Sequence, residues 1–294
     1  MGTLISEKYA AWEKKCDERF NKLKANEEEL NRIFIGIYGL QKEMTPEVEE
    51  KDVTVRRADL TREIKSLISY AVGCIFGRYS LDTEGLVYAG GAWDDTRYKT
   101  IIPVEENLIQ IGGGASGEDL ASRIADFVRI VYGEDTLEEN LRFIADALGG
   151  KGDSREVIEN YLLTGFFADH CRIYQKRPIY WLFSSGKKHG FKALSYMHRW
   201  DRSVVTDLLT SRVRETQERF RAQLSQLEEQ MAEGSQSERV KLKKREEKLN
   251  SQLSELEEYE EKVRRISETV TDIDPDDGVR VNYAKFQDIL EKIR

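Results

Sequence analysis

The 294-residue sequence predicts a mainly α-helical protein of the α+β type, with a helical framework around one small aromatic β-hairpin. Three observations support this fold class. Apolar residues recur at helical spacing towards both ends of the chain, and two apolar runs flank a polar, glycine-bounded loop in its second half. Charged residues make up 34% of the chain and apolar residues 39%. This balance is typical of a helix-rich folded protein rather than a disordered chain.

The first segment, residues 1–44, is expected to form one long amphipathic helix between about Ser6 and Leu40. Large residues recur there at helical spacing, with charged residues between them: Trp12, Cys16, Phe20, Leu23, Leu30, Phe34 and Ile37. This period indicates a helix that packs through one face.

The second segment, residues 45–170, is expected to form a helical body with glycine-rich loops. Helices are predicted at residues 59–76, 118–132, 136–148 and 154–163. Asp59 is a candidate N-cap of the first of these helices. Glycines and Pro103 interrupt Leu81–Gln110, which therefore predicts irregular chain with short strands.

Within this body, Gly112–Gly117 spells GxGxxG after an apolar run and before a predicted helix. That context suits a loop that holds a dinucleotide or S-adenosylmethionine. No second βαβ unit surrounds the motif, however, so simple linker glycines are the preferred interpretation.

The third segment, residues 171–202, holds the most concentrated chemistry. Eight Lys/Arg, seven aromatic residues and the single acid Asp201 lie between Arg172 and Arg202. Apolar runs at Ile179–Phe183 and Phe191–Met197 predict two strands, and a polar loop joins them.

A basic loop on an aromatic hairpin is one way to bind nucleic acid, because Lys/Arg neutralise phosphates and aromatic faces stack on unpaired bases. The alternative is that the aromatics form core while the lysines only solvate a loop. The formal charge of −8 means that any DNA contact must be local. The candidate nucleic-acid-binding residues are Lys176, Arg177, Lys187, Lys188, His189, Lys192, Arg199 and Arg202.

The fourth segment, residues 203–270, predicts a long antiparallel coiled-coil helical hairpin. Asp201 or Ser203 can cap its first helix, and Ser235–Glu238 forms a capping box for the second. Leucine or valine recurs there every seven residues, at Leu242, Leu249, Leu256 and Val263.

A basic cluster lies near the turn of this hairpin, made of Arg239, Lys241, Lys243, Lys244, Arg245 and Lys248. Three glutamates dilute it, so a solvated face is preferred to a contact with the DNA backbone. In the last segment, residues 271–294, Asp277-Gly278 predicts a turn before a VRVNY strand and a final helix.

Three stretches, residues 26–55, 56–82 and 176–200, closely resemble the C-terminal part of the PglX family. This family comprises adenine-specific DNA methyltransferases of bacterial BREX phage-defence systems, with relatives among restriction-modification enzymes. The resemblance implies a C-terminal module that supports DNA engagement or specificity. It implies double-stranded DNA and the catalytic methyltransferase domain as partners. The alternative is a docking module that binds other subunits of the defence complex through the coiled-coil hairpin.

Such methyltransferases hold the target amine in a [DNS]PP[YFW] loop. The four prolines of this chain, at positions 46, 103, 178 and 275, are never adjacent, so the loop is absent from the sequence. No catalytic, cofactor-binding or metal-binding residue is therefore assigned. The resemblance places S-adenosylmethionine in an upstream catalytic domain, and whether this chain is itself an enzyme is left open.

The composition also predicts a cytoplasmic protein without a membrane segment. Cys16, Cys74 and Cys171 form no CxxC pair, which suits a reducing compartment. The first residues have neither a basic region nor an apolar core, and no apolar run approaches the ~20 residues of a membrane span.

Overall fold

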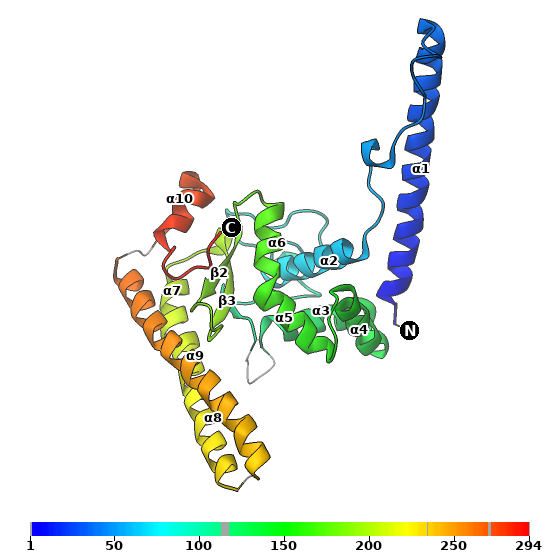
Figure 1. The fold of residues 1–294 in the computed structure, drawn as a ribbon. Helices are drawn as coiled ribbons and strands as arrows, with labels where there is room; N and C mark the ends of the chain where they lie inside the picture. The colour runs from blue at the N-terminus through cyan, green and yellow to red at the C-terminus, as the bar shows by residue number, and fades with distance from the viewer. Residues whose placement is uncertain (1, 113–117, 234, 270–271, 294) are drawn as a thin grey trace. The chain divides into compact units, whose positions relative to one another are not determined.

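A computed structural model describes residues 2–112, 118–233, 235–269 and 272–293 (Figure 1). Helices dominate and accompany one three-stranded antiparallel sheet, so the predicted mainly α fold class is confirmed. The chain divides into two compact units, Met1–Leu67 with Val128–Ser154 and Ile68–Phe127 with Arg155–Arg294. Helices α2 (Leu60–Ile75) and α3 (Leu120–Tyr132) contribute residues to both.

In the first unit, α1 (Ile5–Tyr38) is the predicted long helix, and α4 (Leu137–Ala147) packs near its start. The Asn140 side chain accepts from the Ile5 amide at 2.8 Å and donates to the Thr3 carbonyl at 3.0 Å. Asn140 thus supplies a cap that α1 lacks in its own sequence. Further along α1, Phe34 and Ile37 are more than half exposed, so the helical period continues beyond the residues that are buried.

The predicted cap of α2 is also confirmed, because the Arg62 amide donates to the Asp59 carboxylate at 2.7 Å. The three short helices predicted after it correspond to α3, α4 and α5 (Ser154–Thr164). A further helix, α6 (Phe166–Ile173), was not predicted.

In the second unit, β2 (Tyr180–Ser184) and β3 (Lys192–Tyr196) form the predicted hairpin. A short third strand, β1 (Ile109–Gln110), pairs with β3, which gives the order β1-β3-β2. Every residue of β2 and β3 is buried, so both faces of the hairpin are covered.

The aromatic residues of this hairpin are core. Tyr180, Trp181, Phe183, Phe191 and Tyr196 are each at most 1% exposed. Their rings therefore cannot stack on nucleic-acid bases, so that interpretation is wrong for these residues and the core interpretation is confirmed. The stacking hypothesis failed because aromatic residues drive core formation as strongly as they favour base contacts.

After the sheet, α7 (Ser203–Asp207), a π-helical segment (Leu208–Val213) and α8 (Arg214–Glu233) run on to α9 (Gln236–Thr269). Figure 1 shows α8 and α9 side by side and antiparallel, as the sequence predicts. The buried residues of α9 include three at the predicted seven-residue spacing: Leu249, Leu256 and Val263.

The C-terminal segment differs from the prediction, because VRVNY is not a strand but part of α10 (Gly278–Lys285). The Asn282 side chain donates to the Gly278 and Asp274 carbonyls, which closes a helical turn. Tyr283 and Phe286 then lie against Trp181, with ring centroids 5.5 and 5.9 Å away. An alternating apolar pattern this short does not separate a strand from a helix.

Beyond α10, the chain runs along the edge of β2 that does not pair with β3. The Ser184 amide donates to Ile289 O at 3.2 Å, and the Glu291 amide donates to Leu182 O at 2.7 Å. In the described part of the chain, no helix is long and apolar enough to cross a membrane.

His170 gives a prediction for the pH dependence of stability. Its Nε2 accepts from the amides of Ile179 and Tyr180 at 3.0 and 3.1 Å, and burial lowers its pKa to about 3. Since the unfolded value is near 6.5, this histidine stabilises the fold above pH 6.5 and loses that contribution as the pH falls towards 3. Between pH 7 and pH 4 the loss is about 3 kcal/mol.

We therefore expect His170→Gln to be less stable than the wild type at pH 7 but to lose less stability on acidification. Urea unfolding of both proteins at pH 7 and pH 4 measures the difference, and carboxylates common to both cancel. Equal losses in the two proteins would contradict this role for His170.

Candidate nucleic-acid interface

The β2–β3 loop (residues 185–191) is fastened to α9 by one carboxylate. Glu255 accepts from Ser185 Oγ at 2.8 Å, from the Lys188 amide at 2.8 Å and from the Gly190 amide at 3.3 Å. Hydrogen bonds to a charged acceptor are stronger than neutral ones. Glu255 therefore fixes the backbone of a loop that would otherwise be expected to be flexible.

Two glycines allow the loop to approach α9 this closely. A Cβ atom at Gly190 would lie 2.8 Å from the carbonyl oxygen of Gln252, and one at Gly186 would lie 2.6 Å from Oε2 of Glu255. Gly186 also has φ +144, which few side-chain-bearing residues adopt. Gln252 Nε2 completes the attachment by donating to the Lys188 carbonyl at 2.9 Å.

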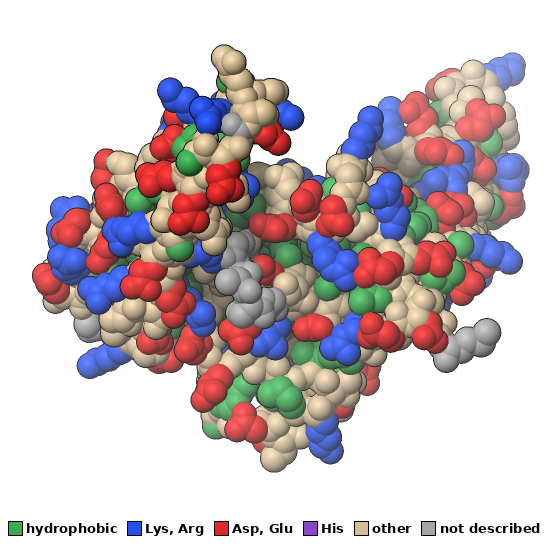
Figure 2. Space-filling model, turned by 90° about the horizontal axis from the view of Figure 1, so that it is seen from below, with side chains coloured by type: hydrophobic (Ala, Val, Ile, Leu, Met, Phe, Trp, Pro, Cys, Tyr) green, Lys and Arg blue, Asp and Glu red, His purple; other side chains and the backbone are tan. Residues whose placement is uncertain are grey.

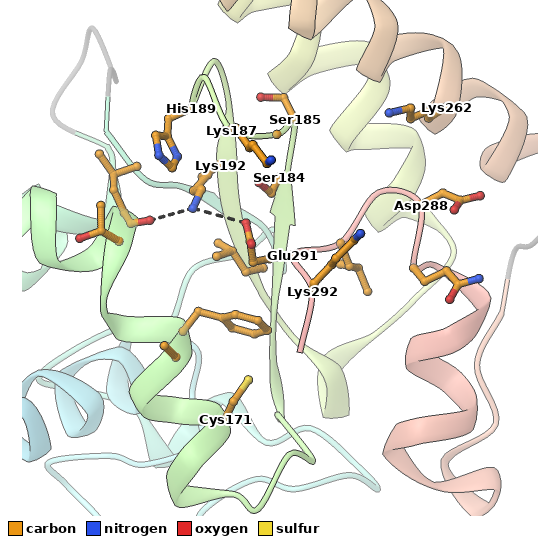
Figure 3. A pocket seen from close by; sticks show the side chains of 18 of the residues that line it. Cys171, Ser184, Ser185, Lys187, His189, Lys192, Lys262, Asp288, Glu291 and Lys292 are labelled. Atoms are coloured by element: carbon orange, nitrogen blue, oxygen red, sulfur yellow. Dashed lines mark hydrogen bonds and ion pairs between the residues drawn. The ribbon is translucent and has the colours of Figure 1, made fainter. Parts of the chain in front are cut away.

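Beside the loop lies a cavity of about 1220 Å³ (Figure 3). Its walls come from α6, the β2–β3 loop, α9 and the C-terminal segment. Lysine or arginine contributes seven lining residues: Arg172, Lys176, Lys187, Lys192, Lys262, Arg265 and Lys292. Only Asp288 and Glu291 are acidic in this lining, and we call the space the cationic cavity.

Two of these cations have acidic partners. Lys192 is 5% exposed, donates from Nζ to Leu163 O at 2.8 Å and lies 3.5 Å from the Glu291 carboxylate (Figure 3). Arg172 lies 3.3 Å from Asp169 on the same helix. Lys192 thus joins β3 to α5 and to the C-terminal segment, and its charge is compensated within the fold.

The other five cations, Lys176, Lys187, Lys262, Arg265 and Lys292, have no ion pair in the part of the chain that the structure describes. Other arginines of the helical hairpin are paired, for example Arg214 with Glu260 and Arg221 with Glu257. Figure 2 likewise shows acidic and basic side chains intermixed over one face of the molecule. The cationic cavity is therefore a local concentration of uncompensated positive charge.

The predicted binding residues divide between this cavity and other places. Lys176, Lys187, His189 and Lys192 line the cavity, whereas Arg177, Lys188, Arg199 and Arg202 are not among its lining residues. Desolvation and the neighbouring Lys192 ammonium lower the pKa of His189, so it contributes little charge at pH 7. Arg177 and Lys188 are exposed.

Arg199 and Arg202 have partners within the fold. The Arg199 guanidinium donates to Val104 O at 2.9 Å and lies 4.2 Å from the ring centroid of Trp93. Burial lowers its pKa. Arg202 is exposed and lies 3.3 Å from the Asp272 carboxylate. The contacts of Arg199 indicate that it holds the chain around Trp93 in place.

Sequence reasoning missed Lys262 and Arg265 on α9 and Lys292 near the C-terminus. The first two stand three residues apart, which places them on one helix face. In the sequence they lie among alternating charges that resemble any solvated helix, and nothing local signals their closeness to the loop. The Gly112–Gly117 motif lies largely outside the described residues.

No family model matches this chain. It is 48% identical over 95% of its length to the adenine-specific methyltransferase PglX of Lacticaseibacillus casei, and 36% identical over 99% to the adenine-specific methyltransferase BrxX of Escherichia coli. It spans about a quarter of the length of these relatives, 24% and 27%. Over that part the chain belongs to the PglX family of adenine-specific methyltransferases and corresponds to their C-terminal region, as the resemblance predicted.

The Glu255 attachment predicts a stability effect. Glu255→Ala removes the acceptor of three hydrogen bonds, two of them from amides of the loop. We therefore expect the free energy of unfolding to fall by about 2 kcal/mol. Urea unfolding measures the loss, and hydrogen exchange of the Lys188 and Gly190 amides should accelerate.

The matched control is Glu258→Ala, one turn along α9 at an exposed position, where a change within about 0.5 kcal/mol is expected. If both variants were equally stable and the loop amides stayed protected, Glu255 would not fix the loop.

Proposed function

We propose that this chain is a non-catalytic C-terminal module of an S-adenosylmethionine-dependent adenine-specific DNA methyltransferase in phage defence. In this proposal, the β2–β3 loop and the cationic cavity engage double-stranded DNA. The observation that carries the proposal is the group of five unpaired cations around one cavity, in a chain of net charge −8.

Two physical arguments support this function. Lysine and arginine bind DNA mainly by neutralising phosphates and releasing counterions, and unpaired side chains are available for that exchange. In addition, Glu255 and Gln252 fix the loop backbone before any ligand arrives, which lowers the conformational entropy lost on binding.

Catalysis and cofactor binding belong, in this proposal, to the remainder of the methyltransferase. The chain has no adjacent prolines and so cannot supply the loop that holds the target amine. S-adenosylmethionine would bind in the catalytic domain, which is then the first protein partner of this module.

Charge reversal of the loop tests the proposal. We expect Lys187→Glu/Lys188→Glu to weaken duplex binding at least about tenfold near 0.1 M salt and to reduce the salt slope by about 2, roughly one unit for each lysine. Fluorescence anisotropy with a labelled duplex at several salt concentrations measures both quantities.

The control is Lys243→Glu/Lys244→Glu near the far end of α9, where acidic neighbours dilute the basic cluster. Affinity there should remain nearly unchanged. A loss of affinity equal to that of the loop variant would place the DNA contact at the tip of the helical hairpin. Salt-independent binding by the wild type would argue against contact with phosphates.

The docking alternative requires a different experiment. Removing all of α8 and α9 would also remove Glu255, so the deletion should be limited to residues 229–247, bridged by a short glycine linker. Normal DNA affinity with loss of other defence subunits in a pull-down would favour docking. Retention of those subunits would exclude the distal hairpin as their binding surface.

A further inference from the structure

The cationic cavity draws its unpaired charge from segments far apart in the sequence: Lys176 after α6, Lys187 in the β2–β3 loop, Lys262 and Arg265 on α9, and Lys292 near the C-terminus. We infer that this cavity is a binding site for adjacent backbone phosphates, through which the module holds DNA without reading its sequence. The inference rests on the proposed function and assigns the site three residues that the sequence did not suggest, Lys262, Arg265 and Lys292.

Charge is the first argument. Arg172 and Lys192 are compensated by Asp169 and Glu291, which leaves five cations against Asp288 as the remaining acid of the lining. Like charges around one hollow repel each other, and the repulsion is relieved when an anion enters. Because several cations face the same space, a ligand with more than one negative charge fits it better than a single carboxylate.

Shape is the second argument. Base edges are recessed in the grooves of a duplex and are reached by an element that projects, usually a helix or a strand pair. Phosphates lie on the outside of the duplex and can enter a hollow. Here the cations line a concave wall between α6, α9 and the C-terminal segment, and Figure 3 shows Lys187, Lys262 and Lys292 on different sides of that space.

Chemistry is the third argument. The aromatic residues of β2, β3 and their loop are buried, so these rings add no stacking on bases to the charge. Contacts between lysine or arginine and phosphates fix register and strength of binding but carry no direct sequence information. The cavity therefore contributes affinity, and sequence discrimination must come from another part of the methyltransferase.

The test uses the full chain and two labelled duplexes of equal length and unrelated sequence. The variant is Lys262→Glu/Arg265→Glu on α9, with Lys262→Gln/Arg265→Gln as a milder substitution and thermal unfolding as a check of folding. Lys243→Glu/Lys244→Glu is the matched control, because it reverses two charges on the same helix away from the cavity.

We expect the charge reversal to weaken binding of both duplexes equally, at least about tenfold, and to lower the salt slope by about 2. The milder variant should lose less affinity and the control almost none. Wild-type protein should bind the two duplexes within about threefold of each other, because phosphate contacts do not distinguish bases.

Full affinity of a folded Lys262→Glu/Arg265→Glu variant would overturn the inference, and of the proposed function only DNA engagement by the β2–β3 loop would remain. A preference of tenfold or more for one duplex, lost in the variant, would also overturn it, since the cavity would then read sequence. If wild-type protein bound neither duplex, the proposed function itself would fail.

Inorganic pyrophosphate distinguishes the two sources of adjacent phosphates. At constant ionic strength it should displace the duplex from wild-type protein and bind the Lys262→Glu/Arg265→Glu variant at least tenfold more weakly in calorimetry. Pyrophosphate binding that depends on these residues, without any binding of DNA, would assign the cavity to a free polyphosphate and refute the DNA assignment.

Discussion

The attachment of the β2–β3 loop to α9 is the constraint on which the candidate interface depends. Glu255 receives three hydrogen bonds from the loop, and one turn further along the same helix Tyr259 donates to Ile289 O and packs near Phe191. α9 therefore fixes both the loop and the C-terminal segment relative to the sheet. The cationic cavity exists because these parts are held apart at fixed positions and not because any one of them is basic.

Positively charged side chains in the framework and in the cationic cavity differ in whether they have partners within the fold. Two cations that the fold buries wholly or in part have partners there, Lys192 in Glu291 and a carbonyl, and Arg199 in carbonyls and the face of Trp93. A buried charge without partners would be very costly, so these contacts follow from burial itself. The cavity cations for which the described residues show no ion pair are exposed or half-buried, so solvent reaches their charge.

Features determined by local sequence could be predicted, including the long first helix, the Asp59 cap, the strand pair and the seven-residue period of α9. Features that need tertiary placement could not. Nothing near Lys262 or Lys292 reveals that the chain brings both to Lys187. VRVNY alternates like a strand, yet Asn282 and the packing of Tyr283 on Trp181 favour a helix. The role of the aromatic residues was ambiguous for a related reason, because aromatic side chains occur both in protein cores and on base-binding surfaces.

The close contacts of Gly186 and Gly190 divide the β2–β3 loop into positions with different freedom to change. A side chain at either glycine would collide with Glu255 or with the backbone of α9. Lys187 and Lys188 are exposed, and the hydrogen bonds of Lys188 to α9 use its backbone. Amino-acid exchanges at those two positions would alter the surface potential and leave the fold intact. The charge of the loop can therefore be changed in small steps at Lys187 and Lys188, by natural variation or by protein engineering, without changes elsewhere in the fold.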